Sequence, residues 1–153
     1  MNREEFLAAT NAYLERLMMA VHELPEVQLH QPITEGAHSV CELFSILAVR
    51  AESIIRALDR LYQGLEPELA ALPVKSNPEF KRAQSALRIA HTTVSAALER
   101  IPLSRLDPDG NLPGWLCDNY LKPLEGNVPV IEQWAKDLRA RGLAGPAGLP
   151  VIQ

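Results

Sequence analysis

The side chains of this sequence that could do chemistry are, first of all, its four histidines. His22, His30, His38 and His91 contain no pair with the i, i+4 spacing of two metal ligands on one helix, and no H-E-x-x-H motif is present. His91 borders an apolar helical stripe, so we interpret it as a partly buried structural histidine; a general base in a pocket is the alternative. The histidines therefore predict no metal site of their own.

Two cysteines are candidate nucleophiles. Cys41 lies in the first turn of a predicted helix, where backbone amides and the helix dipole lower a thiol pKa, and His38 precedes it by three residues. We nevertheless favour a small apolar role for Cys41, and equally for Cys117 near the start of the last predicted helix. Two cysteines form no disulfide framework, so reduced thiols and a cytoplasmic protein are expected.

Arg50 is the third candidate, on the edge of an apolar helix face and one turn after Ile46. An arginine at such a position can reach an acidic ligand or pair with a buried carboxylate. More often it extends its charged end to solvent.

Four amphipathic segments must position these side chains, and their apolar residues recur every three or four positions. Ser39 and Glu42 match a capping box for the second segment, and Gly64 suits its end. Asn77 and Pro78 favour a start for the third. The segments cover residues 3–24, 39–62, 77–101 and 115–139.

The fourth segment contains Pro123, Gly126 and Pro129, so we expect a kink or a break between Lys122 and Val130. Four such helices in one domain of this length predict an all-α four-helix bundle. We assign residues 1–141 to a single domain and residues 142–153 to an irregular Gly/Pro-rich tail.

The amino-acid composition indicates which classes of binding partner are not expected. The 153 residues are 47% hydrophobic and 22% charged with a net charge of −4, which is typical of one soluble globular domain. Lys and Arg form no run, so no nucleic acid partner is expected. No stretch approaches the roughly 18 apolar residues of a membrane span, so no membrane partner is expected either.

The stretch G-A-H-S-V-C-E-L-F-S-I-L, residues 36–47, resembles the second helix of DinB/YfiT-like proteins, whose pattern is G-x-W-S-V-x-[DE]-[VL]-L-x-H-L. Residues 127–134, N-V-P-V-I-E-Q-W, are similar to the H-x-P-x-I-x-x-W segment of the ClbS/DfsB branch. The resemblance implies a four-helix bundle with up-down-down-up connectivity. It also implies a homodimer, for which Trp115, Trp134 and the apolar tail are possible contact surfaces.

Many members of this superfamily bind a divalent metal through three histidines. The corresponding positions here are Ile46, Pro123 and Asn127, and this set offers at most one weak ligand. The resemblance thus implies that the metal site is lost and that no cofactor is bound. If a pocket survives at this place, we expect five residues around it: Ile46, Arg50, His91, Tyr120 and Asn127.

Two functional hypotheses follow. The first is a metal-free helical bundle that binds a small molecule or a partner protein. The alternative, implied by the ClbS/DfsB resemblance, is a metal-independent hydrolase or a sequestering protein that protects against a reactive small molecule. An enzyme should keep a solvent-reachable cavity with converging polar groups and a shifted pKa, whereas a binding or structural protein should fill its centre with apolar side chains.

Overall fold

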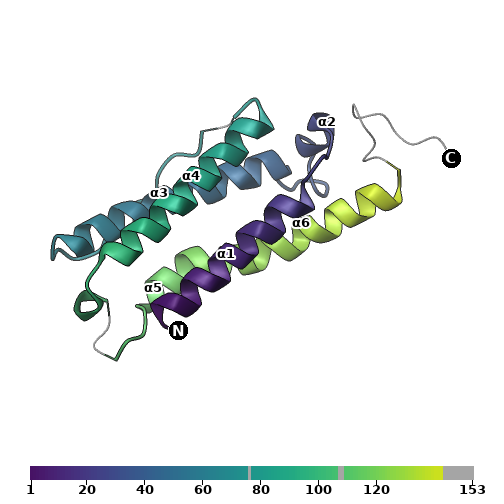
Figure 1. The fold of residues 1–153 in the computed structure, drawn as a ribbon. Coiled ribbons are helices and arrows are strands. Elements are labelled where there is room, and N and C mark those ends of the chain that lie inside the picture. Colours follow the sequence, from purple (N-terminus) through teal and green to yellow (C-terminus); the bar gives the residue numbers. More distant parts are fainter. Residues whose placement is uncertain (76, 107–108, 143–153) are drawn as a thin grey trace.

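The computed structural model describes residues 1–75, 77–106 and 109–142, so nearly all of the predicted tail lies outside the described residues. No strand occurs in these ranges, and a single bridge joins Pro32 to Ser39. The predicted all-α class is therefore confirmed (Figure 1). The long helices are α1 (Arg3–Ala20), α3 (Val40–Tyr62), α4 (Phe80–Arg100) and α6 (Lys122–Ala140); the short segments are α2 (Glu26–Leu29), η1 (Leu103–Arg105), α5 (Gly114–Leu116) and η2 (Cys117–Leu121).

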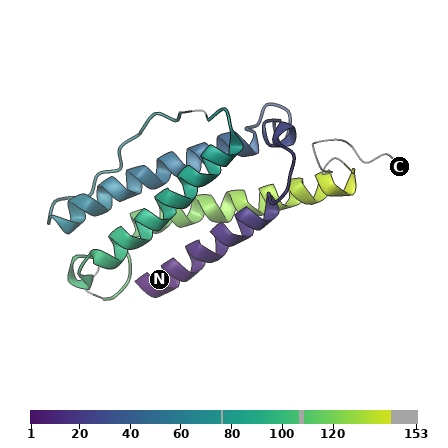
Figure 2. The ribbon, with the colours of Figure 1, turned by 45° about the horizontal axis from the view of Figure 1, so that its top comes forward.

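The long helices pack as two pairs (Figure 1). Helix α3 lies against α4, and α1 lies against α6, while the π-helical η2 contacts both α1 and α3. Residues 63–75 and 77–79, in the connection from α3 to α4, run back along the outside of the first pair (Figure 2). One buried apolar cluster joins the pairs, and its largest members include Phe6, Phe44, Leu58, Leu98 and Ile131.

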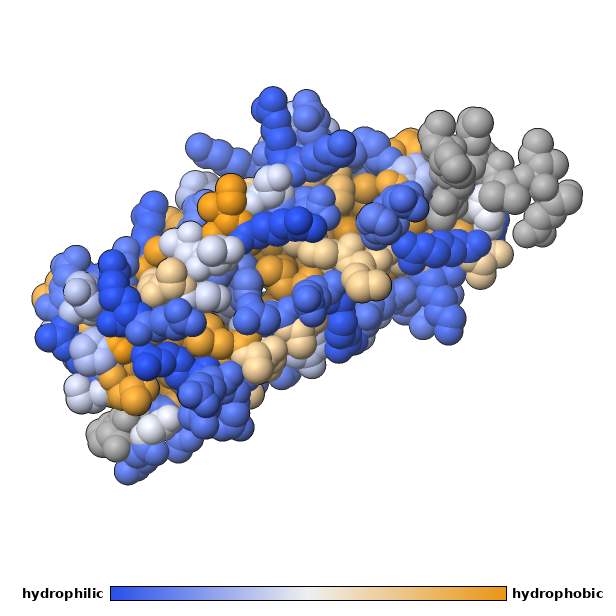
Figure 3. All heavy atoms as spheres, viewed as in Figure 1, coloured by the Kyte–Doolittle hydropathy of each residue, from blue (hydrophilic) through white to orange (hydrophobic). Residues whose placement is uncertain are grey.

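Helix α1 contacts α4 much less than it contacts α6. A shallow depression remains there, lined by Leu14, Met18 and Arg88 among others. Figure 3 shows apolar surface between the two helix pairs on this face.

Helix α3 begins and ends as its sequence predicts. The Glu42 N–H donates to Ser39 Oγ at 3.1 Å, and the Ser39 N–H donates to Glu42 Oε1 at 3.3 Å. This reciprocal pair is the predicted capping box, because each side chain satisfies one backbone donor of the first turn. Gly64 has a φ of 80°, the left-handed conformation expected beyond the end of a helix.

The start of α4 was predicted wrongly. The residue that precedes the helix is Glu79, whose side chain makes no capping hydrogen bond. The Phe80 N–H instead donates to Glu26 Oε1 at 2.8 Å, and His30 Nε2 holds the same oxygen at 2.7 Å. Asn77 lies three residues before Phe80, outside the capping position, and its amide donates to Ser45 Oγ at 3.4 Å. Helix α4 thus takes its cap from α2.

Two other boundaries also differ from the prediction. Helix α1 ends at Ala20 rather than near residue 24, and Glu23 follows with a φ of 58°. Helix α6 is continuous from Lys122 to Ala140 with Pro129 inside it, so of the kink or break expected between Lys122 and Val130 the break is wrong, and a kink stays a prediction. Pro123 falls in the first turn of α6, where a missing N–H costs little. The irregular stretch is instead the wide turn of η2, just before α6.

Candidate functional site

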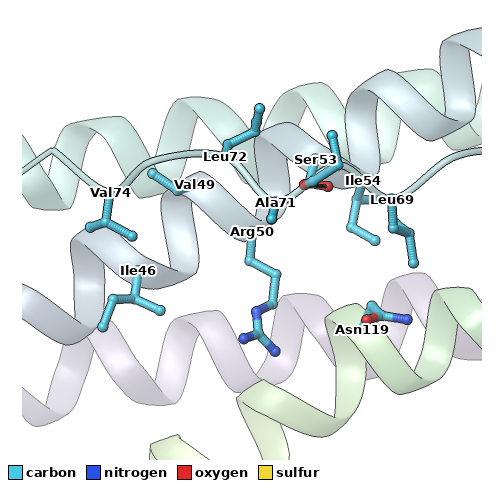
Figure 4. Close-up of a pocket in the computed structure, with 11 residues that line it drawn as sticks. Ile46, Val49, Arg50, Ser53, Ile54, Leu69, Ala71, Leu72, Val74 and Asn119 are labelled. Atoms are coloured by element: carbon cyan, nitrogen blue, oxygen red, sulfur yellow. Dashed lines mark hydrogen bonds between the residues drawn. The ribbon is translucent and has the colours of Figure 1, made fainter.

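A groove on α3 is one of several hollows in the described part of the chain (Figure 4). Helix α3 forms one wall, residues 69–74 form the other, and η2 contributes one side chain. The groove encloses about 330 Å³, at the lower end of the range for small-molecule sites. Its lining consists of Ile46, Val49, Arg50, Ser53, Ile54, Leu69, Ala70, Ala71, Leu72, Val74 and Asn119.

The outer wall is an extended segment held to α3 by few bonds. Ser53 Oγ donates to Ala70 O at 2.7 Å, which fixes the middle of the segment. Arg60 Nε donates to Glu66 O at 2.7 Å, which fixes its start. Leu69 and Val74 remain 41% and 50% exposed, so this wall presents apolar side chains that the core does not cover.

Two polar side chains face this apolar lining. Arg50 extends from α3 on the same side of that helix as Asn119 (Figure 4). Within the described residues, the Arg50 guanidinium makes no hydrogen bond or ion pair. Asn119 Nδ2 donates to Trp115 O at 2.7 Å, which orients its amide and leaves Oδ1 and the second amide proton without a bond in the described structure. The groove therefore joins an apolar surface to one unpaired positive charge.

His91 and Tyr120 belong to a different place, the interior between the helix pairs. His91 Nδ1 lies 2.6 Å from Tyr120 Oη, and His91 Nε2 lies 2.6 Å from Asn11 Oδ1. The two rings are stacked, with an interplanar angle of 9°. The distances fit a neutral imidazole that accepts from the phenol at Nδ1 and donates to the amide at Nε2.

Burial determines the ionisation of this pair. It lowers the pKa of His91 and raises the pKa of Tyr120, because the charged form of each is poorly solvated. With both nitrogens engaged, the imidazole has no free lone pair for a substrate proton. The geometry supports the structural interpretation of His91 over that of a general base.

The five residues predicted around one pocket are thus not brought together. Ile46 and Arg50 line the groove, whereas His91 and Tyr120 lie in the interior network. Asn127 lies on α6, where its Nδ2 donates to Pro123 O at 2.7 Å. The physical reason is the helix packing: His91 lies on α4 and bonds to Tyr120 in the interior, and Asn127 lies on α6, which packs mainly against α1 rather than α3.

Asn119 and the segment 69–74 are the site residues that sequence reasoning missed. The segment has no helical periodicity, and its extended course along α3 depends on the Ser53 bond described above. Its three large apolar residues within a connection, Leu69, Leu72 and Val74, were the available signal.

The cysteines do not gain the activation considered for them. Burial raises the pKa of the Cys41 thiol, and the nearby carboxylates of Glu26 and Glu42 raise it further. The pKa of the Cys41 thiol is therefore raised although the residue lies in the first turn of a helix, and the lowered pKa expected for that position is wrong. Burial likewise raises the pKa of Cys117. Both thiols are free and fit the small apolar role.

The metal ligands of the resembled family have no substitute in the described ranges. No three His, Cys, Asp or Glu side chains gather there in a way that could hold a metal ion. Ile46 carries no donor atom, and the Asn127 amide is already bonded to the backbone. The donor set does not fit a zinc or nickel ion.

The tryptophans proposed as dimer contacts are both half-buried and pack against the core, so each has only part of its surface available to a partner. None of the described helices is long and apolar enough to cross a membrane.

Comparison with known proteins adds no assignment. Neither a family model, nor a curated protein, nor a solved structure matches this chain.

Proposed function

We propose that this protein binds an apolar small molecule in the groove between α3 and residues 69–74. The observation that supports this most directly is the lining, in which apolar side chains from two separate segments surround a space that the core leaves unfilled. Apolar surface of this kind gains free energy when a ligand replaces water, at roughly 25 cal/mol per Å². Two polar groups at its edge can orient the ligand.

We also propose the fold of the resembled superfamily, a four-helix bundle with up-down-down-up connectivity. The pairing of α3 with α4 and of α1 with α6 supports it. So does the long connection from α3 to α4, since neighbouring helices that run in the same direction require a return segment of this kind (Figure 2).

Binding is better supported than catalysis. An enzyme needs polar groups that converge on a reacting atom. The polar side chains of the groove are Arg50, Asn119 and Ser53, and the Ser53 hydroxyl donates to Ala70 O with no base among the lining residues to activate it. The two interior groups whose pKa values burial shifts, His91 and Tyr120, bond to each other. Sequestration of a reactive small molecule requires only a groove, so that part of the alternative hypothesis is compatible with the structure; hydrolysis stays a prediction.

The test is binding of Nile red, an uncharged dye whose fluorescence rises in apolar surroundings. Ala71→Trp should block the groove, because Ala71 lines it from an exposed, non-helical segment where a large side chain disturbs no core packing. Ala86→Trp is the matched control, since Ala86 is exposed on α4 and lines no part of the groove. We expect saturable binding to the unsubstituted protein and to Ala86→Trp, and at least tenfold weaker binding to Ala71→Trp. Equal binding by all three proteins would place the dye elsewhere and refute the proposal.

A further inference from the structure

We propose that the ligand of the α3 groove is a linear monocarboxylate, with its carboxylate on Arg50 and its alkyl chain along Ile46 and Val74. This inference rests on the proposed function and adds the chemical class of the ligand. Two independent features of the groove support it: the unpaired charge of Arg50 and the shape of the apolar walls.

The charge argument begins with the composition of the lining. Arg50 is the one ionisable side chain among the lining residues described, and no carboxylate accompanies it there. The protein as a whole carries a net charge of −4, yet the described structure supplies Arg50 with neither an ion pair nor a hydrogen bond. A cation beside an apolar surface favours an anionic group on an otherwise apolar ligand, and disfavours a cationic one.

The fork of N–H donors on a guanidinium matches the two oxygens of a carboxylate, which it can bind with two parallel hydrogen bonds. One arginine neutralises one negative charge. Asn119, on the same side of α3, can add a neutral donor without adding charge (Figure 4). The site therefore fits a single carboxylate better than a doubly charged phosphate.

The shape argument concerns the part of the groove beside Arg50. Ile46 lies four residues before Arg50, about 6 Å along the axis of α3, and Leu72 and Val74 line the opposite wall. Ile54, four residues after Arg50, is fully buried and offers a ligand no surface. Val74 is 50% exposed and Ile46 is partly exposed, so a chain that leaves Arg50 toward Ile46 meets apolar side chains on both walls. A groove of about 330 Å³ suits a single chain better than a fused ring system.

Competition with bound Nile red tests the inference on the full-length protein. Decanoate and decanol share the alkyl chain and differ in charge, so we expect decanoate to bind about tenfold more tightly. Arg50→Met keeps an apolar stem but removes the charge. It should weaken decanoate binding about tenfold and leave decanol and Nile red unchanged. Arg56→Met is the control, because Arg56 is an exposed arginine of the same helix outside the groove.

The possible outcomes separate the two proposals. If Nile red binds in the groove but decanoate and decanol compete equally, or if Arg50→Met binds decanoate as tightly as the unsubstituted protein, the carboxylate inference is wrong and the groove proposal stands. If neither Nile red nor decanoate binds, both proposals are wrong. Decanoate binding that Arg56→Met weakens as much as Arg50→Met would reflect general attraction to positive charge, and would also overturn the inference.

Discussion

The hydroxyl of Tyr120 should contribute more to stability than any other single polar atom in the interior network. Tyr120→Phe removes that hydroxyl and keeps the ring, so apolar packing is nearly unchanged. His91 Nδ1, which lies 2.6 Å from the hydroxyl, then has no donor. Tyr120 is 4% exposed and His91 is 6% exposed, so water has little access to replace the lost bond. A buried acceptor left unsatisfied costs about 1–3 kcal/mol, and we expect a loss of about 2 kcal/mol.

Urea unfolding followed by circular dichroism at pH 8 measures this loss as a lower midpoint at an unchanged slope. Tyr62→Phe is the matched control, because Tyr62 is 43% exposed and its hydroxyl makes no bond in the described structure. The control should stay within about 0.5 kcal/mol of the unsubstituted protein. If Tyr120→Phe also stays within that range, the hydroxyl does not act as the buried donor to His91, and the assignment of the network is wrong.

The same network predicts the direction of a pH dependence. Burial lowers the pKa of His91 in the folded state below its ordinary value near 6.5, so the unfolded state binds the proton more readily. The stabilising contribution of neutral His91 is fully present above that value and decreases as the pH falls below it. Unfolding free energies at pH 8 and pH 5 should differ more for the unsubstituted protein than for His91→Gln. Equal differences would contradict a buried neutral imidazole.

Three further substitutions test the local structure, and urea unfolding measures the change that each makes in the free energy of unfolding. Glu26→Ala removes the carboxylate that accepts the Phe80 N–H and should cost about 1 kcal/mol, whereas Glu52→Ala on exposed α3 surface should cost little. Gly126→Ala should stabilise α6 by about 0.5–1 kcal/mol, because a methyl group there meets no atom within 4 Å and alanine is the better helix former. Gly64→Ala, at a φ of 80°, should destabilise instead. A neutral Glu26→Ala, or a Gly126→Ala that lowers stability, would contradict the local structure described.

The parts of this fold that could be predicted from the sequence are those decided by neighbouring residues. The capping box of Ser39 and Glu42 depends on residues three positions apart, and the apolar face of α3 depends on spacings of three and four. Both were predicted correctly. The start of α4 depends on Glu26, which lies 54 residues before Phe80, and nothing in the local sequence indicates that partner.

The groove could be predicted only in part for the same reason. Ile46 and Arg50 share one face of α3 because they are four residues apart, and the structure places both in the lining. Leu69 and Val74 reach the groove only because the connection lies along α3, and that course is fixed by the bond from Ser53 to Ala70. Long-range pairing of this kind has no periodic signal in the sequence.

Asn119 lies in the π-helical turn of η2, which contacts α3, and from there it lines the groove. A hydrogen bond from Lys122 N–H to Cys117 O spans five residues, so the turn holds one residue more than an α-helical turn and shifts the register by about 100°. Such turns occur often at functional sites. Here the turn contributes Asn119 to the groove while the next residue, Tyr120, enters the interior and bonds to His91. One irregular turn thus contributes one side chain to the candidate binding surface and the next one to the buried network.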